Sequence, residues 1–169
     1  MGTSRAAVGS LAFLVLEPGT VAVLGSWLTG WVVREAPWPA ASLRVLSAVL
    51  VFLGAAALLH AFGRFVLEGL GTPAPVAPPE RLVVGGLYRH VRNPMYVAVL
   101  AAIIGQALVL GQPGLLLYAA VVGAAMVAFV QGYEQPTLAE RFGVDYEAYR
   151  RAVPAWLPRL QPWRSDRVG

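Results

Sequence analysis

Long apolar runs separated by short polar stretches dominate the chain. The first run covers residues 6–33 and the second covers 43–63, while residues 95–133 contain no charged side chain. The last stretch divides at Gly111-Gln112-Pro113-Gly114, a combination typical of a turn. Because about 20 apolar residues cross a bilayer, this pattern predicts four transmembrane helices, the third and fourth forming a helical hairpin. We expect them at residues 8–33, 43–65, 95–111 and 115–131.

The pattern changes after the fourth run. Between residues 134 and 158, apolar and charged side chains alternate at roughly helical spacing, which is typical of an amphipathic helix lying against a membrane or a bundle. Gly143 should end one short helix in a left-handed conformation. Residues 71–79 are rich in proline and glycine and predict a linker. The expected fold is an all-α integral membrane protein, one domain over residues 1–169 with a C-terminal amphipathic segment.

Composition strengthens the membrane interpretation. Hydrophobic residues make up 57% of the chain and charged residues 13%, against about 45–50% and 25% in soluble domains. A soluble protein of 169 residues could not bury that much apolar surface. The absence of cysteine excludes disulfides, thiol nucleophiles and cysteine-ligated metals. With only two histidines, His60 and His90, we expect no metal site.

The charge distribution predicts an orientation. The net charge is +4 and every basic residue is arginine. A basic balance ordinarily suggests nucleic-acid binding, but these arginines flank the apolar runs and are better explained as topology signals. With four spans, only Arg34 and Arg44 fall on one side, and the positive-inside rule places both termini, residues 85–96 and the amphipathic tail in the cytoplasm. We expect a multi-pass protein of the cell (inner or cytoplasmic) membrane, surrounded by membrane lipids, with no nucleic-acid partner.

Residues 85–96 form a dense polar cluster that leads into the third apolar run. Asn93 is a favoured helix N-cap, and Pro94 suits the first helical position. The amino end of a helix carries partial positive charge and binds carboxylates and phosphates. Arg92 stands beside this end and can clamp an oxyanion through two parallel hydrogen bonds. The cluster therefore predicts an anion site at the membrane boundary.

Further residues extend the predicted site. Gly86 lets the backbone approach a ligand closely, and Tyr88 and Tyr96 supply flat faces for a cation or a purine. Glu134 ends the fourth run on the same predicted side and faces the Arg92 cluster. Each feature has a plain alternative, because arginines beside a membrane helix, an Asn-Pro helix start and a charge at a helix end are all routine.

Two further ionisable residues, Glu17 and His60, fall inside the predicted spans. An ionisable side chain within a membrane suggests a functional site. We favour a structural contact of Glu17 with His60 or with Arg64, because neither residue belongs to the motifs described next.

Two motifs together resemble a known family. Residues 86–96 read Gly-Leu-Tyr-x-x-x-Arg-Asn-Pro-x-Tyr, and residues 134–154 read Glu-x-x-x-Leu-x-x-x-Phe-Gly-x-x-Tyr-x-x-Tyr-x-x-x-Val-Pro. In this order, separated by a helical hairpin, they resemble the isoprenylcysteine carboxyl methyltransferase family and the related phospholipid methyltransferases. The resemblance covers about residues 85–158, nearly the C-terminal half of the chain.

The resemblance implies an integral-membrane enzyme that uses S-adenosylmethionine. Its cofactor pocket would lie at the cytoplasmic boundary and be closed by the C-terminal segment. By position in the motif, the residues lining the cofactor would be Leu87, Tyr88, Asn93, Pro94 and Tyr96.

The tail motif supplies the remaining residues. Glu134 would match the first of two acidic residues in the family's tail motif, and Arg150 or Arg151 would match the basic residue near its end. We also place Gly86 and Tyr149 among the cofactor-binding residues. Three positions depart from the family pattern. Gly85 and Asn93 stand where the family often has a histidine, and Gln135 stands where it has the second acidic residue.

The cofactor's chemistry suits these residues. S-adenosylmethionine carries a carboxylate that Arg92 can bind and an ammonium that Glu134 can bind, and we take both as the catalytic residues. We favour a small or lipophilic acceptor with a carboxylate or thiol, because a dry site favours a reaction that neutralises opposite charges. With a phospholipid amine instead, Glu134 is the candidate base. A non-catalytic helical membrane protein, such as a transporter subunit, is the other alternative. The sequence does not indicate an oligomeric state.

Overall fold

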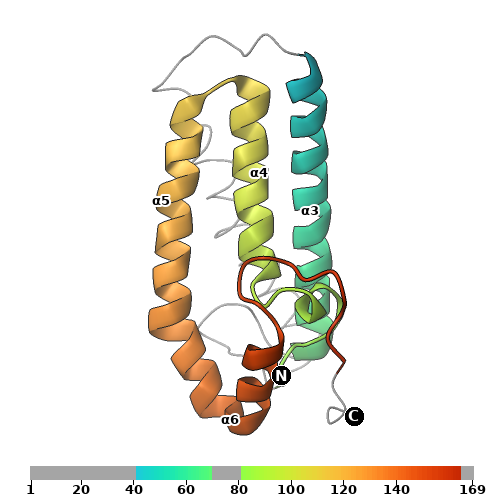
Figure 1. Cartoon of the computed structure of the whole chain (residues 1–169), viewed down its shortest axis with the longest axis vertical. Helices are drawn as coiled ribbons and strands as arrows, with labels where there is room; N and C mark the ends of the chain where they lie inside the picture. The colour runs from blue at the N-terminus through green and yellow to red at the C-terminus, as the bar shows by residue number, and fades with distance from the viewer. Residues whose placement is uncertain (1–40, 70–80, 165–169) are drawn as a thin grey trace.

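The computed structural model describes residues 41–69 and 81–164, and every regular element in these two ranges is helical. In Figure 1, three long helices stand side by side, and the last helix folds back at the end where the first of them finishes. The all-α expectation is therefore confirmed for the described residues. The elements in chain order are α3 (Ala41–Gly69), the 3₁₀ turn η2 (Gly86–Arg89), α4 (Pro94–Leu110), α5 (Pro113–Phe129), the π turn η3 (Val130–Glu134) and α6 (Gln135–Ala152).

The second, third and fourth apolar runs become α3, α4 and α5, as expected. Two helical stretches, Val45–Arg64 and the one that begins at Pro113, are long and apolar enough to cross a membrane, whereas α4 is shorter. Only 22% and 17% of the residues in these stretches are buried, unlike the core helix of a soluble protein. The expected first span at 8–33 and the linker at 71–79 lie outside the described residues, so the number of four spans remains a prediction.

Small residues bring α3 and α4 into close backbone contact. A Cβ atom on Gly105 would lie 2.7 Å from Val51 Cγ2 and 3.2 Å from the Ser47 carbonyl oxygen. A Cβ atom on Gly54 would lie 3.0 Å from the Ala98 carbonyl oxygen. Because glycine has no side chain, these positions allow the close helix contact that is common in membrane bundles. This packing holds α4 against the first half of α3.

The α4–α5 hairpin turns where the sequence predicts it. Gly111 follows α4 with φ 63° and ψ 39°, a left-handed conformation that costs glycine little, and Pro113 begins α5. Below the turn, Val99 and Ile103 pack against Ala119 in a fully apolar cluster. The hairpin therefore brings the end of α5 back to the level at which α4 starts.

The helix that continues from α5 has two irregularities, each with a local cause. Pro136 has no N–H group and its ring clashes with the carbonyl four residues earlier, which accounts for the π turn at Val130–Glu134. Gly143 has φ 50° and ψ −121° and kinks α6. Gly143 thus separates two short helices at a positive φ, as expected, but its ψ lies outside the left-handed helical region, so the conformation is not the left-handed cap that the sequence predicted.

Candidate functional site

The segment after α6, residues 153–164, runs back across the polar cluster at residues 85–93 (Figure 1), and we name it the C-terminal strap. Its backbone is fixed at four points. The Arg92 and Asn93 amides donate to the carbonyls of Pro154 and Ala155 at 2.9 and 3.3 Å. The amides of Arg159 and Trp163 donate to the carbonyls of His90 and Arg89 at 3.0 and 2.9 Å, respectively. The structure thus brings the two sequence motifs together.

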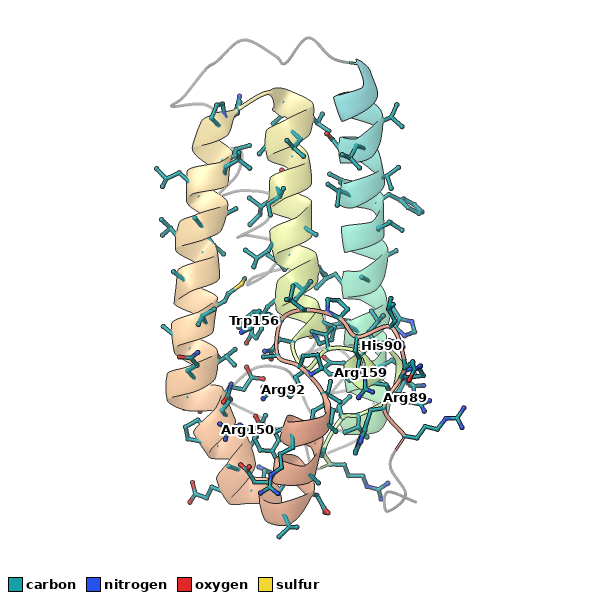
Figure 2. All side chains as sticks on the ribbon, in the orientation of Figure 1. Arg89, His90, Arg92, Arg150, Trp156 and Arg159 are labelled. Atoms are coloured by element: carbon teal, nitrogen blue, oxygen red, sulfur yellow. The ribbon has the colours of Figure 1, made fainter. Side chains whose placement is uncertain are left out.

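Side chains reinforce the attachment of the strap, as Figure 2 shows for Arg89, His90 and Arg159. Arg89 Nε donates to the Trp163 carbonyl at 2.7 Å, and His90 Nδ1 lies 2.8 Å from the Arg159 carbonyl. A carbonyl only accepts hydrogen bonds, so Nδ1 carries a proton in this contact. Arg159 NH1 donates to the Ala152 carbonyl at 2.7 Å. Arg89 and His90 therefore serve to hold the strap.

A partly open cavity of about 120 Å³ lies between the start of α4, the π turn and α6. It combines residues from both sequence motifs with residues that precede the first motif. Its lining consists of Leu82, Val83, Tyr88, Arg92, Asn93, Val130, Tyr133, Glu134, Gln135, Thr137, Leu138, Tyr146 and Tyr149.

Arg92 lines the cavity and also braces its walls. Its Nε donates to the Val153 carbonyl at 2.9 Å, and its NH1 approaches the Tyr146 hydroxyl at 3.4 Å. The Nε side of the guanidinium is therefore occupied by the strap. The predicted pair of parallel hydrogen bonds to an oxyanion would therefore have to come from the two terminal nitrogens.

Asn93, the residue directly before α4, is 7% exposed and lines the cavity. Asn93 occupies the N-cap position of α4, as expected, and its carbonyl accepts from the Val97 amide at 3.1 Å, but its side chain makes no capping hydrogen bond. Its Nδ2 is buried without a hydrogen-bond partner. Leaving such a donor unpaired costs about 1–3 kcal/mol. The site therefore contains a buried donor that lacks an acceptor.

Glu134 lies at the end of the π turn, where it lines the same cavity. The Tyr96 hydroxyl donates to Glu134 Oε2 at 3.2 Å. Burial raises the pKa of the Glu134 carboxyl above its ordinary value, while the Tyr96 hydrogen bond and the positive charge of Arg92 partly counteract this rise. A carboxyl of this kind binds a cation or accepts a proton more readily than one in water.

Three tyrosines form the polar wall opposite Glu134. The Tyr149 hydroxyl donates to the Tyr88 carbonyl at 2.7 Å in a buried contact, which ties α6 to η2. The Tyr149 ring also packs against Trp163 of the strap, with centroids 5.4 Å apart. Burial raises the pKa values of Tyr146 and Tyr149, so both remain neutral at physiological pH.

Several residues predicted from the sequence lie outside the cavity. Gly86 has φ 55° and approaches α3 rather than a ligand, because a Cβ atom there would lie 2.7 Å from His60 Nε2. Leu87 packs beside the cluster that contains Tyr88, and Pro94 is buried in the first turn of α4. Arg150 points outward and pairs with Glu147 at 3.3 Å. Tyr96 reaches the site only through Glu134. Glu17 lies outside the described residues.

Sequence reasoning missed three residues of the far wall, Val130, Tyr133 and Thr137. They lie in or directly after the π turn, whose wider winding changes the face that each side chain presents. Pro136 was the available signal, since a proline just after an apolar run predicts an irregular turn before it.

The apolar, outward-facing helices and the polar cavity at their ends are typical of a membrane protein with a polar site at the bilayer boundary, and the family match makes that class a membrane methyltransferase. A family model described as "Phospholipid methyltransferase" matches residues 38–145, which is more than half of the chain. The chain belongs to the phospholipid methyltransferase family, and the resemblance drawn from the two motifs is confirmed. Members of this family generally use S-adenosylmethionine. Neither the curated proteins nor the solved structures provide a match.

Proposed function

We propose that this protein transfers a methyl group from S-adenosylmethionine to a lipophilic acceptor, and that the cavity at residues 82–149 is the reaction site. The observation that carries the proposal is the convergence of Arg92, Asn93 and Glu134 on one cavity from two distant parts of the chain. Family membership supplies the reaction type, and these side chains supply the local chemistry.

The residues present fit the amino-acid end of the cofactor. Asn93 Nδ2 is a buried donor without an acceptor, and Arg92 adds a positive charge beside it, so the two suit a carboxylate. Glu134, across the cavity, suits an ammonium group. One site therefore offers complementary charges to both polar groups of an amino acid.

The size of the cavity limits how much of the cofactor it encloses. Its volume of about 120 Å³ is below the roughly 300–1,000 Å³ of sites that surround a whole drug-sized ligand. The amino-acid end fits within this space, and the remainder of the cofactor lies along the open side. Tyr133, which is 47% exposed at the edge of the cavity, offers an aromatic face there.

The protein's own contribution is orientation of the two reactants and exclusion of water from the polar groups that hold the cofactor. S-adenosylmethionine supplies an activated methyl group on its sulfonium when bound. The strap and α6 close one side of the cavity through Arg92 and Tyr149, which keeps the polar groups in fixed positions. Positioning of two reactants in line is the largest contribution such a site can make without covalent catalysis.

The nature of the acceptor follows from Glu134. A desolvated carboxylate repels an acceptor carboxylate, whereas it attracts an ammonium. We therefore favour a phospholipid amine over the carboxylate or thiol that the sequence alone suggested. The family description supports the same choice. The acceptor nitrogen must then lose one proton before methyl transfer, and this proton leaves to solvent at the open side of the cavity, because Glu134 pairs with the cofactor ammonium.

The proposal includes a topology. Four spans with both termini in the cytoplasm would put α6, the strap and the cavity at the cytoplasmic boundary, as the arginine distribution predicts. Phe52 of α3 is 73% exposed and Leu117 of α5 is 69% exposed, which suits contact with lipid tails. A lipid acceptor would then enter sideways from the bilayer.

The experiment uses the purified full chain in lipid nanodiscs with methyl-labelled S-adenosylmethionine. Discs containing phosphatidylethanolamine should yield labelled lipid, whereas discs of phosphatidylcholine with added fatty acid or prenylated thiol should not. Labelling of the fatty acid or thiol alone would overturn the amine assignment. No labelled product with any of the three acceptors, in protein that stays folded, would overturn the proposed reaction.

A further inference from the structure

The C-terminal strap displays two large apolar side chains to the outside. Leu160 is 98% exposed and Leu157 is 80% exposed. The strap is nevertheless held firmly, because its Arg159 and Trp163 amides both donate hydrogen bonds to the polar cluster. The leucines are therefore presented by an ordered backbone on both sides of Arg159. A single exposed leucine needs no explanation, but further features of this segment point to what contacts the pair.

The charge of the segment is uniform. Residues 150–164 contain four arginines and no acidic residue. Arg151 and Arg164 are exposed, whereas Arg150, also exposed, pairs with Glu147 at 3.3 Å and Arg159 donates to the Ala152 carbonyl. Clustered arginines beside exposed apolar side chains complement a surface with negatively charged groups outside and an apolar layer beneath them. An anionic lipid leaflet has this structure.

The location of the strap matches a bilayer surface. The Trp156 ring lies 6.3 Å from that of Tyr96, in the first turn of α4, so the strap crosses at the level where the apolar helix begins. Figures 1 and 2 show the strap and Trp156 at this end of the three long helices. Tryptophans flank the two leucines at positions 156 and 163, and this residue type favours the headgroup region of membranes.

We propose that the C-terminal strap is a membrane-docking segment for an anionic lipid surface. Leu157 and Leu160 insert between the headgroups, and the neighbouring exposed arginines contact lipid phosphates. The same strap supplies the carbonyls that bind the Arg92 and Asn93 amides. Docking therefore holds one wall of the cavity at the bilayer surface, where a lipid acceptor arrives. The docking itself does not depend on the proposed reaction.

The test measures how deeply the strap lies in the bilayer. Because the chain has no cysteine, Leu160→Cys gives a single site for a fluorescent label in the full-length protein. Val144→Cys is the matched control, since Val144 is 78% exposed in α6, just after the kink. Labelled proteins are compared in nanodiscs of phosphatidylcholine alone and of phosphatidylcholine with phosphatidylglycerol, using doxyl lipids as bilayer quenchers and iodide as the aqueous quencher.

The label at position 160 should be quenched several-fold more by doxyl lipids, and less by iodide, than the label at position 144. The difference should be larger in the anionic discs, and the triple variant Arg150→Gln/Arg151→Gln/Arg164→Gln should reduce it. Equal iodide quenching at positions 160 and 144 in anionic discs would overturn the proposal. Equal insertion in neutral and anionic discs would overturn the anionic specificity. Neither readout requires cofactor or methyl transfer, so failure here is distinguishable from failure of the proposed function.

Discussion

Replacement of Glu134 by glutamine should separate ligand binding from stability. The substitution keeps the shape of the side chain and an oxygen that can accept the Tyr96 hydrogen bond, but removes the negative charge. If Glu134 holds the ammonium of S-adenosylmethionine, the variant loses a charge-assisted hydrogen bond in a buried site. Such a bond contributes about 1.5–3 kcal/mol, so the dissociation constant should rise roughly 10- to 150-fold.

The same substitution should leave the thermal stability of the ligand-free protein unchanged or raise it. Burial raises the pKa of Glu134 above the ordinary 4.5, which means that folding disfavours the ionised form. The stabilising contribution of the group is fully present below its unfolded pKa and is lost as the pH rises through its folded pKa. At neutral pH, glutamine avoids this cost, because it has no charge to desolvate.

Isothermal titration calorimetry in detergent measures the affinity, and Tyr96→Phe is the companion variant. Wild-type affinity should strengthen as the pH rises above 4.5, the ordinary pKa of a glutamate, because the carboxylate must ionise to bind the ammonium. Tyr96→Phe should raise the pH at which the affinity is half of its maximum, because the Tyr96 hydrogen bond that it removes favours the ionised form of Glu134. Unchanged affinity in Glu134→Gln, or reduced affinity together with a lowered melting temperature in the absence of ligand, would refute this reasoning.

Three further substitutions test the site and its scaffold. Asn93→Ala should weaken S-adenosylmethionine binding in calorimetry while leaving the melting temperature equal or higher, because it removes a buried donor whose burial costs about 1–3 kcal/mol; a large loss of stability would contradict this. Gly105→Ala should lower the melting temperature in detergent, because its Cβ atom would lie 2.7 Å from Val51 Cγ2. Gly123→Ala is the control and should leave the melting temperature unchanged, because its Cβ atom would lie 3.6 Å from Leu100. Equal effects of the two substitutions would refute the close α3–α4 contact. Gly86→Ala should lower the free energy of unfolding by at least about 1–2 kcal/mol, because alanine is strained at a φ of 55°. Adding His60→Ala should recover only the part of this loss that comes from the clash of the new Cβ with the His60 ring. Chemical denaturation measures both effects.

The helices could be predicted because their signals are local. Runs of apolar residues interrupted by Gly111 and Pro113 locate α4, α5 and the turn between them. The positive φ of Gly143 was likewise readable, but whether the helix ends or resumes there depends on what the following residues pack against. Tyr146 and Tyr149, after the kink, are buried in an apolar cluster with Leu82 and Val84, and this packing stabilises the second helical segment.

Only part of the predicted site comes together in the structure, and its roles stay predictions. Motif spacing associated Arg92 with Glu134, and both line one cavity, whereas Gly86, Leu87 and Pro94 lie outside it. It could not show that Arg92 spends its Nε on the Val153 carbonyl, or that Gly86 is required by α3, since both depend on contacts between distant segments. Asn93 is the clearest case: local rules correctly place it at the N-cap of α4, but they do not show that its side chain leaves the capping bond unmade or that its backbone amide donates to the strap.

Direct photocrosslinking of labelled S-adenosylmethionine, followed by peptide mapping, tests the location of the cofactor most directly. Ultraviolet irradiation of the full chain in nanodiscs should attach the label to peptides from both sides of the cavity, residues 82–93 and 130–149, which contain its four tyrosines. Excess unlabelled cofactor should abolish the labelling. Saturable labelling confined to α3 or to the α4–α5 turn would contradict the proposed site.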